Sequence, residues 1–290
     1  MLSLTQQNQQ FVLHTQPFRF QIRSNSPSLF SQVSQLYPAP LLSDNDDGNI
    51  IDFVVDFKRN ILSLSQDYAF RLGSQHFRFT PLAQQLSVLE WGMNWCISSY
   101  QNRYLCLHAA VLEQDGRCLI LPAPPGSGKS TLCAILMLEG WRLLSDEHCL
   151  IDPHSGLIVP CVRPVSLKNR SLTVIQQRYP SVQLQGIQQN TFKGTMGYLP
   201  PTALSWDGRI DAVRPAMVIF PKYQPDGSGV QLEAMAQSTL MLELAINSFN
   251  YSTLGQNGFE TLSLLAAQCP GYRLTYTDTE QMLQQLQALW

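Results

Sequence analysis

The residues with the clearest chemical potential form a short glycine-rich run near the middle of the 290-residue chain. The run is Gly126-Ser127-Gly128-Lys129-Ser130-Thr131, and Pro125 precedes it. Glycines let backbone N–H groups turn inward around phosphate oxygens, a lysine reaches the β- and γ-phosphates, and the next hydroxyl sits on Mg²⁺. We therefore expect residues 125–131 to bind a nucleotide, with Lys129 on the phosphates and Ser130 on the metal.

The sequence on both sides of this run fits a phosphate-binding loop. An apolar run at 117–121 predicts a strand before it, and apolar residues at helical spacing follow Ser130. One position departs from the usual pattern, because Ala123 stands five residues before Gly128, where such loops carry their first glycine. Nucleotide binding is the interpretation we favour, and a turn that merely begins a helix is the alternative.

Two adjacent carboxylates supply a second element that phosphoryl transfer needs. Asp146 and Glu147 end an apolar run, and Asp146 lies sixteen residues after Ser130. Neighbouring strand residues point to opposite faces, so the two carboxylates would do different jobs. One can hold Mg²⁺ while the other accepts the proton of the acceptor hydroxyl. A solvated acidic turn is the alternative.

Five further residues are weaker candidates. His108 lies in a predicted strand, where a buried structural histidine is the simpler reading of the sequence alone. Arg163 and Lys168 fall in an expected loop, where they could reach an anion or only face solvent. Lys193 and Lys222 are weaker candidates for the same role. The chain has five lysines, and an arginine-biased composition explains that scarcity as well as a role in phosphate chemistry does.

Periodic patterns predict the elements that would position these residues. We expect helices at 27–37, 86–99, 238–249 and from 277 onward, and strands at 17–23, 50–57, around 68–79, at 104–113, 117–121 and 216–220, with 141–152 as one strand or a strand pair. Asp115-Gly116 is a turn signal that makes 104–121 a hairpin. The organisation is an N-terminal α+β region over residues 1–95 and an α/β domain over 96–290.

Bulk properties exclude several classes of protein. A net charge of −2 leaves no electrostatic footprint for nucleic acid. We find neither a signal peptide nor an apolar run of membrane-spanning length, so a cytoplasmic protein is the expectation. The seven cysteines contain no C-x-x-C pair and several lie in apolar runs, which predicts buried reduced thiols rather than a metal site or disulfides.

Three segments, in this order and spacing, resemble the kinase domain of HPr kinase/phosphorylase, and more closely its HprK-related kinase A relatives. They are Leu107-His-Ala-Ala, Pro124-Pro-Gly-Ser-Gly-Lys-Ser-Thr and Gly140-Trp-Arg-Leu-Leu-Ser-Asp-Glu. The segments that begin at Arg163, Lys193, Phe220 and Asn247 are also similar to that subfamily. The resemblance is specific over residues 104–150 and softer after that.

The resemblance implies a mixed-sheet P-loop kinase core of the HPr kinase/PEP carboxykinase type, with ATP as donor, Mg²⁺ as cofactor and a serine hydroxyl as acceptor. By position, Asp146 matches the general base and His108 the histidine that precedes the loop. Glu147 matches a metal-side carboxylate, where the HPr enzymes carry Asp. Lys129 and Ser130 match the phosphate and Mg²⁺ residues.

Two family segments are missing, and they bear on the acceptor. The chain has no Glu-Ile-Arg-Gly stretch and no Pro-Gly-Arg-Asn loop, which handle the protein substrate and the reverse reaction in the HPr enzymes. The related subfamily resembles components of peptide-modification clusters that work with a small PqqD-like peptide chaperone, so the resemblance favours a peptide or protein acceptor. An ATP-binding switch without phosphotransfer and a small-molecule kinase are the alternatives, and a homo-oligomer is compatible with the family.

Overall fold

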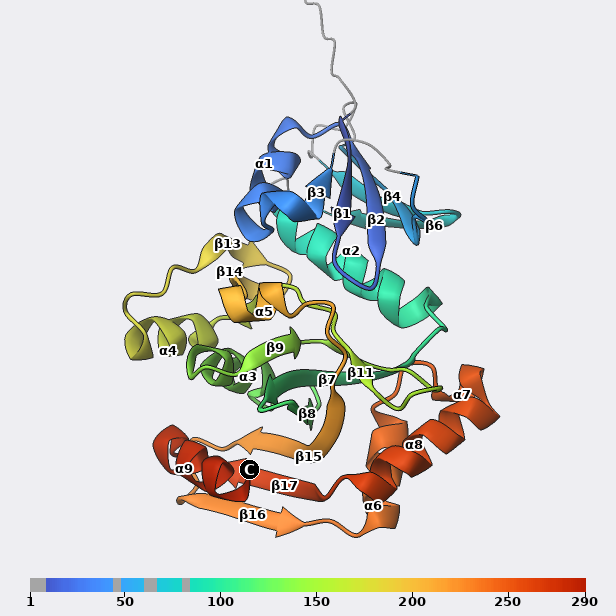
Figure 1. Cartoon of the computed structure of the whole chain (residues 1–290). Coiled ribbons are helices and arrows are strands. Elements are labelled where there is room, and N and C mark those ends of the chain that lie inside the picture. The colour runs from blue at the N-terminus through green and yellow to red at the C-terminus, as the bar shows by residue number, and fades with distance from the viewer. Residues whose placement is uncertain (1–8, 44–47, 60–66, 80–83) are drawn as a thin grey trace, which may run out of the picture. The chain divides into compact units, whose positions relative to one another are not determined.

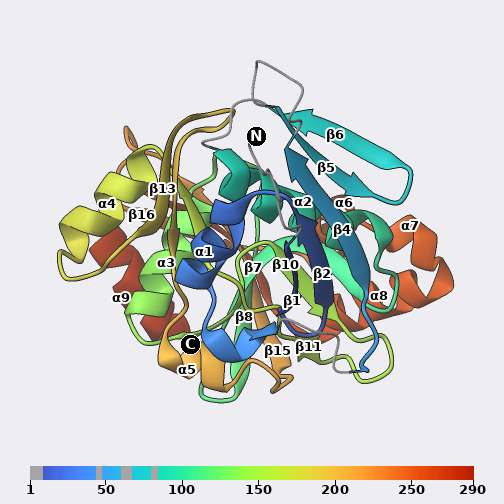
Figure 2. The ribbon, with the colours of Figure 1, turned by 90° about the horizontal axis from the view of Figure 1, so that it is seen from above.

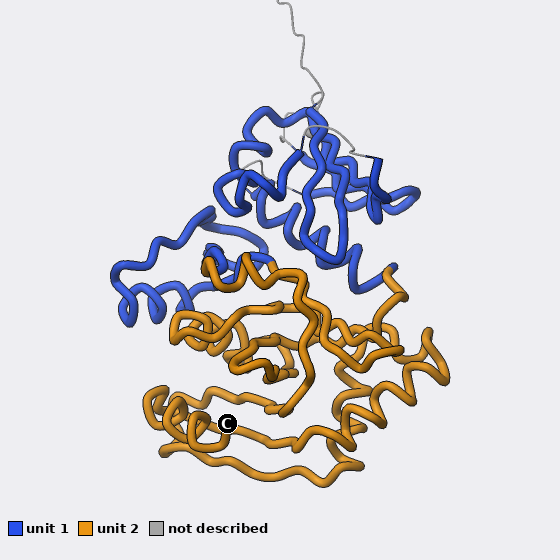
Figure 3. Tube along the Cα trace, in the orientation of Figure 1, with its two compact units in different colours: residues 1–100, 163–201 blue, residues 101–162, 202–290 orange. Residues whose placement is uncertain are grey.

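The computed structural model describes residues 9–43, 48–59, 67–79 and 84–290, and it is a mixed α/β protein (Figures 1 and 2). These residues form two compact units, coloured separately in Figure 3. Unit 1 comprises residues 1–100 and 163–201, and unit 2 comprises residues 101–162 and 202–290. The sequence placed 163–201 with the kinase domain, whereas in the structure these residues pack with the N-terminal region.

Unit 1 is built from a six-stranded sheet, a three-stranded sheet and three helices of two turns or more. The larger sheet has the order β3-β1-β2-β4-β5-β6, with only β2 and β4 parallel. The smaller has the order β12-β14-β13. The strands are β1 (Gln9–His14), β2 (Arg19–Ser24), β3 (Leu42–Ser43), β4 (Phe53–Arg59), β5 (Tyr68–Leu72), β6 (Gln75–Phe79), β12 (Val165–Lys168), β13 (Gln185–Thr191) and β14 (Gly194–Leu199); the helices are α1 (Pro27–Leu36), the 3₁₀ turn η1 (Ala39–Leu41), α2 (Gln85–Tyr100) and α4 (Arg170–Arg178).

Unit 2 is built on an eight-stranded mixed sheet with the order β11-β10-β7-β8-β15-β17-β16, and β9 pairs with β7 off this path. Strands β8, β15 and β17 run parallel, and the other pairs are antiparallel. The strands are β7 (Leu105–Gln114), β8 (Arg117–Pro122), β9 (Arg142–Ser145), β10 (His148–Ile151), β11 (Ile158–Val159), β15 (Arg214–Tyr223), β16 (Val230–Ala234) and β17 (Gly271–Tyr276).

Helices cover this sheet. They are α3 (Lys129–Leu138), α5 (Ala203–Asp207), α6 (Gln237–Ile246), α7 (Tyr251–Leu254), α8 (Gln256–Gln268) and α9 (Thr279–Leu289). Leu240 of α6 and Leu262 of α8 pack in one buried cluster with Leu107, Val111 and Val218 of the sheet. The side chains at alternate positions of β7, including His108, therefore point to the opposite face.

The strongly periodic predictions are confirmed. The expected helices correspond to α1, α2, α6 and α9, and the segment 141–152 is a strand pair, β9 and β10. The hairpin of β7 and β8 turns at Asp115 and Gly116, both with positive φ, as a tight two-residue turn requires. The polar run Ser43-Asp-Asn-Asp-Asp-Gly48 predicts a turn, and most of it lies outside the described residues. All seven cysteines are buried.

Candidate active site

The glycine run forms the loop that connects a strand to the helix that follows it. Strand β8 ends at Pro122, and α3 begins at Lys129 with Gly128 as its N-cap. Gly126 and Gly128 have φ of +88° and +92°, a region that favours glycine. Ala123 is fully buried and has no positive φ. An alanine therefore fits at the position where the usual pattern has its first glycine, and the turn itself depends on the two later glycines.

The loop is fixed to the neighbouring parallel strand. The backbone N–H of Tyr223, the last residue of β15, donates to the carbonyl of Ser127 at 2.8 Å. A Cβ on Gly128 would lie 3.0 Å from the Cβ of Tyr223, whereas a Cβ on Gly126 would meet nothing within 4 Å. The loop thus rests against β15 at Gly128 and faces open space at Gly126. The carboxyl ends of parallel strands are where α/β sheets bind ligands.

Strand register brings the acidic turn beside this loop. Ser145 of β9 pairs with Val111 of β7, and His148 of β10 pairs with His108, so Asp146 and Glu147 lie opposite Ala109 and Ala110. On the other edge of β7 the same two alanines pair with Pro122 and Leu121 at the end of β8. One strand therefore separates the acidic turn from the start of the loop.

The acidic turn is held by Ser145. Its hydroxyl oxygen accepts the backbone N–H groups of Glu147 at 3.3 Å and His148 at 2.9 Å. Asp146 is 5% exposed, whereas 28% of the Glu147 side chain is exposed. The two carboxylates therefore differ in exposure, but they lie in the bend between β9 and β10 rather than in a strand, and both lie near Lys129.

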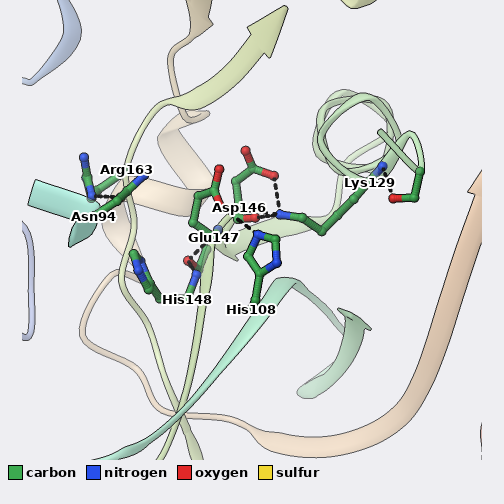
Figure 4. Close-up of polar contacts among 9 residues, drawn as sticks. Asn94, His108, Lys129, Asp146, Glu147, His148 and Arg163 are labelled. Carbon is green, nitrogen blue, oxygen red and sulfur yellow. Dashed lines mark hydrogen bonds and ion pairs between the residues drawn. The ribbon is translucent and has the colours of Figure 1, made fainter. Parts of the chain in front are cut away.

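Lys129 links the loop to both carboxylates (Figure 4). Its Nζ donates to the backbone carbonyl of Asp146 and lies 3.5 Å from Asp146 Oδ1 and 4.0 Å from Glu147 Oε2. Lys129 is only 6% exposed. Burial by itself lowers the pKa of Lys129, but the charges of Asp146 and Glu147 outweigh it and leave that pKa above its ordinary value. The lysine is therefore a buried ammonium at the start of α3.

His108 belongs to the same cluster. Its Nε2 lies 3.1 Å from Glu147 Oε2, and 24% of its side chain is exposed. Burial raises the pKa of Glu147, but Lys129 and the hydrogen bond from His108 lower it more, so the Glu147 pKa lies well below its ordinary value. Glu147 is thus a carboxylate at neutral pH. The sequence alone predicted a buried histidine, whereas the His108 ring is half-buried and contacts Glu147.

The remaining loop residues surround this cluster. Pro125 and Gly126 are exposed, Ser127 is buried, and Ser130 and Thr131 lie half-buried in the first turn of α3. Among the described residues, no group of three or more His, Cys, Asp or Glu side chains could hold a metal ion. A hydroxyl such as Ser130 and an ionised carboxylate such as Glu147 instead suit Mg²⁺, which proteins bind through one or two side chains together with substrate phosphates.

Of the four cations proposed for substrate or phosphate, one shares unit 2 with the loop. Lys222 is exposed near the end of β15, one residue before Tyr223. Lys168 ends strand β12 and Lys193 lies exposed in the β13–β14 turn, both in unit 1. Arg163 is also in unit 1, and it is buried in an ion pair with Glu90. The expectation of a loop is wrong for Lys168, which lies in strand β12. Arg163 does lie in a loop before β12, but its side chain is buried in the ion pair rather than facing solvent.

Three residues of the site were missed from the sequence. They are Ser145, which shapes the acidic turn; His148, which pairs with His108 across β7 and β10; and Tyr223, whose amide holds Ser127. The rings of His108 and His148 each lie 5.8 Å from the ring of Phe249. His148 and Tyr223 reach the site through strand pairing, which no local motif predicts. The role of Ser145 is local, because it accepts from the backbone two and three residues later, and its place directly before Asp146 was the available signal.

Comparison with known proteins assigns the chain to no family. Scanning the chain against protein-family models gives no match, and neither does a search of curated proteins. Within the described part of the chain, every helix is too short or too polar to cross a membrane. The function is therefore inferred from the residues of the site itself.

Proposed function

We propose that the protein is an ATP-dependent kinase that transfers the γ-phosphoryl group to the hydroxyl of a serine in a peptide or protein acceptor. In this proposal the core of unit 2 is a P-loop kinase core of the HPr kinase type. The acceptor belongs to a peptide-modification system, with a PqqD-like peptide chaperone as a natural partner.

The observation that carries the proposal is the position of Lys129. This buried ammonium starts the helix behind a two-glycine turn, and it lies within 4.0 Å of a carboxylate on each of two adjacent residues. A phosphate chain in the turn would meet the lysine and the backbone N–H groups at the start of α3, which together neutralise its charge. The carboxylates would then face the phosphate that transfers.

Each residue of the site has a separate role in phosphoryl transfer. The acceptor oxygen bonds to the γ-phosphorus, the bond from that phosphorus to the oxygen of ADP breaks, and the hydroxyl proton passes to the Asp146 carboxylate. Glu147 and Ser130 would hold Mg²⁺, which when bound shields the charge of the phosphates. His108 orients Glu147 through its 3.1 Å contact.

Calorimetric titration with ATP and Mg²⁺ tests the binding step. Wild type and Asp146→Asn should bind, whereas Lys129→Ala should bind about a hundredfold more weakly, because it loses a charged hydrogen bond to phosphate worth about 1.5–3 kcal/mol. Lys58→Ala, which removes an exposed lysine of unit 1, is the matched control and should bind like wild type. Absence of binding by wild type would overturn the proposal.

Labelled ATP tests the transfer step. A pool of serine-containing peptides should become labelled, a pool with alanine in place of serine should not, and Asp146→Asn should slow labelling by about 10²–10⁴ because an amide cannot accept the proton. ATP binding with release of free phosphate only would favour a nucleotide switch. Undiminished transfer by Asp146→Asn would remove the general-base role.

A further inference from the structure

Strand β6 ends the larger sheet of unit 1. Among the described residues it pairs with β5 alone, from Tyr68↔Phe79 to Leu72↔Gln75, and Figure 2 shows it as the outermost arrow of that sheet. An edge strand presents a row of backbone N–H and C=O groups to which an extended chain can add as a further strand. The two faces of β6 determine which side chains such a chain must carry.

One face of β6 is aromatic. Phe77 lies 5.2 Å from the ring of Trp91 and 4.8 Å from that of Trp95, both on α2. Phe79 lies 5.2 Å from Trp91 and 6.4 Å from Phe192. All five rings keep some exposure, and Phe192 is 53% exposed. This face offers apolar side chains of an added strand a surface that is already partly dehydrated.

The opposite face is basic. His76 and Arg78 are exposed on β6, and in the register of the sheet they pair with Arg71 and Ala69 of β5. Ala69 pairs in turn with Lys58 of β4, and Asp56, which pairs with Arg71, lies 3.6 Å from Lys58. Among the described residues of β4, β5 and β6, three permanent cations and one histidine thus share this face with a single carboxylate, although the whole chain carries a net charge of −2.

We propose that β6 is the docking edge for an extended peptide in which acidic and apolar residues alternate. Side chains of a strand alternate between the faces of a sheet, so every second residue of an added strand would lie beside Phe77 and Phe79, and the others beside His76 and Arg78. Backbone pairing with β6 supplies the affinity, and the two faces supply the selectivity. The surface belongs to unit 1 and requires no nucleotide.

Fluorescence anisotropy on the full chain, without nucleotide, tests the proposal. The probe is a labelled eight-residue peptide of alternating glutamate and valine. It should bind, its affinity should fall with added salt, and Arg78→Glu should weaken it about tenfold, as should His76→Glu as a second variant. Arg170→Glu, an exposed arginine of α4 in the same unit, is the matched control and should leave binding unchanged.

Two altered probes separate this mode of binding from simple charge attraction. A lysine–valine peptide should not bind, and the glutamate–valine peptide with N-methyl groups on all of its amides should lose affinity at least tenfold, because neither of its edges can then donate backbone hydrogen bonds to β6. Equal binding of the methylated peptide, or equal affinity of Arg78→Glu and wild type with both folded, would overturn the proposal. Because no nucleotide is present, neither result depends on whether the protein is a kinase.

Discussion

Glu147 is the residue whose charge depends most directly on its neighbours. Lys129 and His108 depress its pKa in the folded protein, so its ionised form stabilises the fold. That stabilisation is present above the pKa of a free glutamate, about 4.3, and is lost as the pH falls below it toward the depressed folded value. We expect Glu147→Gln to be less stable than wild type at pH 7, and the difference to shrink progressively as the pH falls below about 4.

Urea unfolding of wild type and Glu147→Gln between pH 7 and pH 3 measures this difference. Glu260→Gln, an exposed glutamate of α8, provides a control whose difference from wild type should stay small throughout. A stability difference for Glu147→Gln that is the same at pH 3 and pH 7 would mean that packing, rather than ionisation, is what Glu147 contributes.

The two loop glycines, Gly126 and Gly128, should differ in how much stability is lost when each is replaced by alanine. Both have positive φ, so an alanine at either position is strained by about 1–2 kcal/mol. Gly128→Ala should be destabilised further, because its Cβ would lie 3.0 Å from Tyr223 Cβ, whereas Gly126→Ala has open space. Gly116→Ala, in the β7–β8 turn, also has a φ of +75° and nothing within 4 Å, so it controls for backbone strain alone.

Thermal or urea unfolding of the three alanine variants gives the ranking. Gly126→Ala and Gly116→Ala should lose similar stability, and Gly128→Ala more than either. ATP binding should fall in the two loop variants and persist in Gly116→Ala. If Gly128→Ala were no less stable than Gly116→Ala, then Tyr223 would not restrain the loop.

Among the elements, the local ones were predictable and the assembled ones were not. Strand β8, the loop and α3 are adjacent in sequence, so periodicity and glycine spacing are enough to find them. The proximity of Asp146 to Lys129 depends on how β9 and β10 pair with β7, which no local pattern encodes. Strand β13 (Gln185–Thr191) was missed because its polar sequence lacks apolar alternation. Arg163 looked exposed because its partner, Glu90, lies 73 residues earlier.

Helix α2 packs against β5 through a glycine. A Cβ on Gly92 would lie 2.1 Å from the ring of Phe70, which also contacts Trp91 and Trp95. Alanine normally favours a helix over glycine by about 1 kcal/mol. Here we expect Gly92→Ala to be destabilised by about 1–3 kcal/mol, because overpacking outweighs that gain. Ser99→Ala, at an exposed position of α2, should stay within about 0.5 kcal/mol of wild type by urea unfolding.

At the scale of the whole molecule, unit 1 is discontinuous. The chain leaves it after Tyr100, returns at Arg163 and leaves again after Pro201. Arg163 joins the two segments: its guanidinium donates to the Glu90 carboxylate and to Asn94, and to the Glu90 carbonyl at 3.2 Å. Tyr37 donates to Glu90 at 2.8 Å, so three distant parts of the sequence share one buried polar cluster. Unit 1 therefore completes its core only when residues 163–201 are present.

Loss of either member of this buried pair should be severe. Arg163→Ala leaves Glu90 buried without its cation, which typically costs about 3–5 kcal/mol, and hydrogen exchange in α2 should accelerate accordingly. Arg170→Ala, an exposed arginine of the same segment, should stay within about 0.5 kcal/mol of wild type. An Arg163→Ala variant with normal stability but weaker ATP binding would instead make Arg163 the anion-binding residue that its sequence suggested.

Replacing both members of the ion pair separates the effect of their charges on stability from the effect of their packing. In Glu90→Leu/Arg163→Met no charge is left buried, and apolar side chains of similar length fill the space. Such replacements of buried ion pairs are often neutral or stabilising, so the double variant should recover most of the stability that Arg163→Ala loses. Recovery would show that the Glu90–Arg163 pair determines where segment 163–201 packs but adds little to the free energy of unfolding. If the double variant remained as unstable as Arg163→Ala, the hydrogen bonds to Asn94 and Tyr37 would carry the interaction instead.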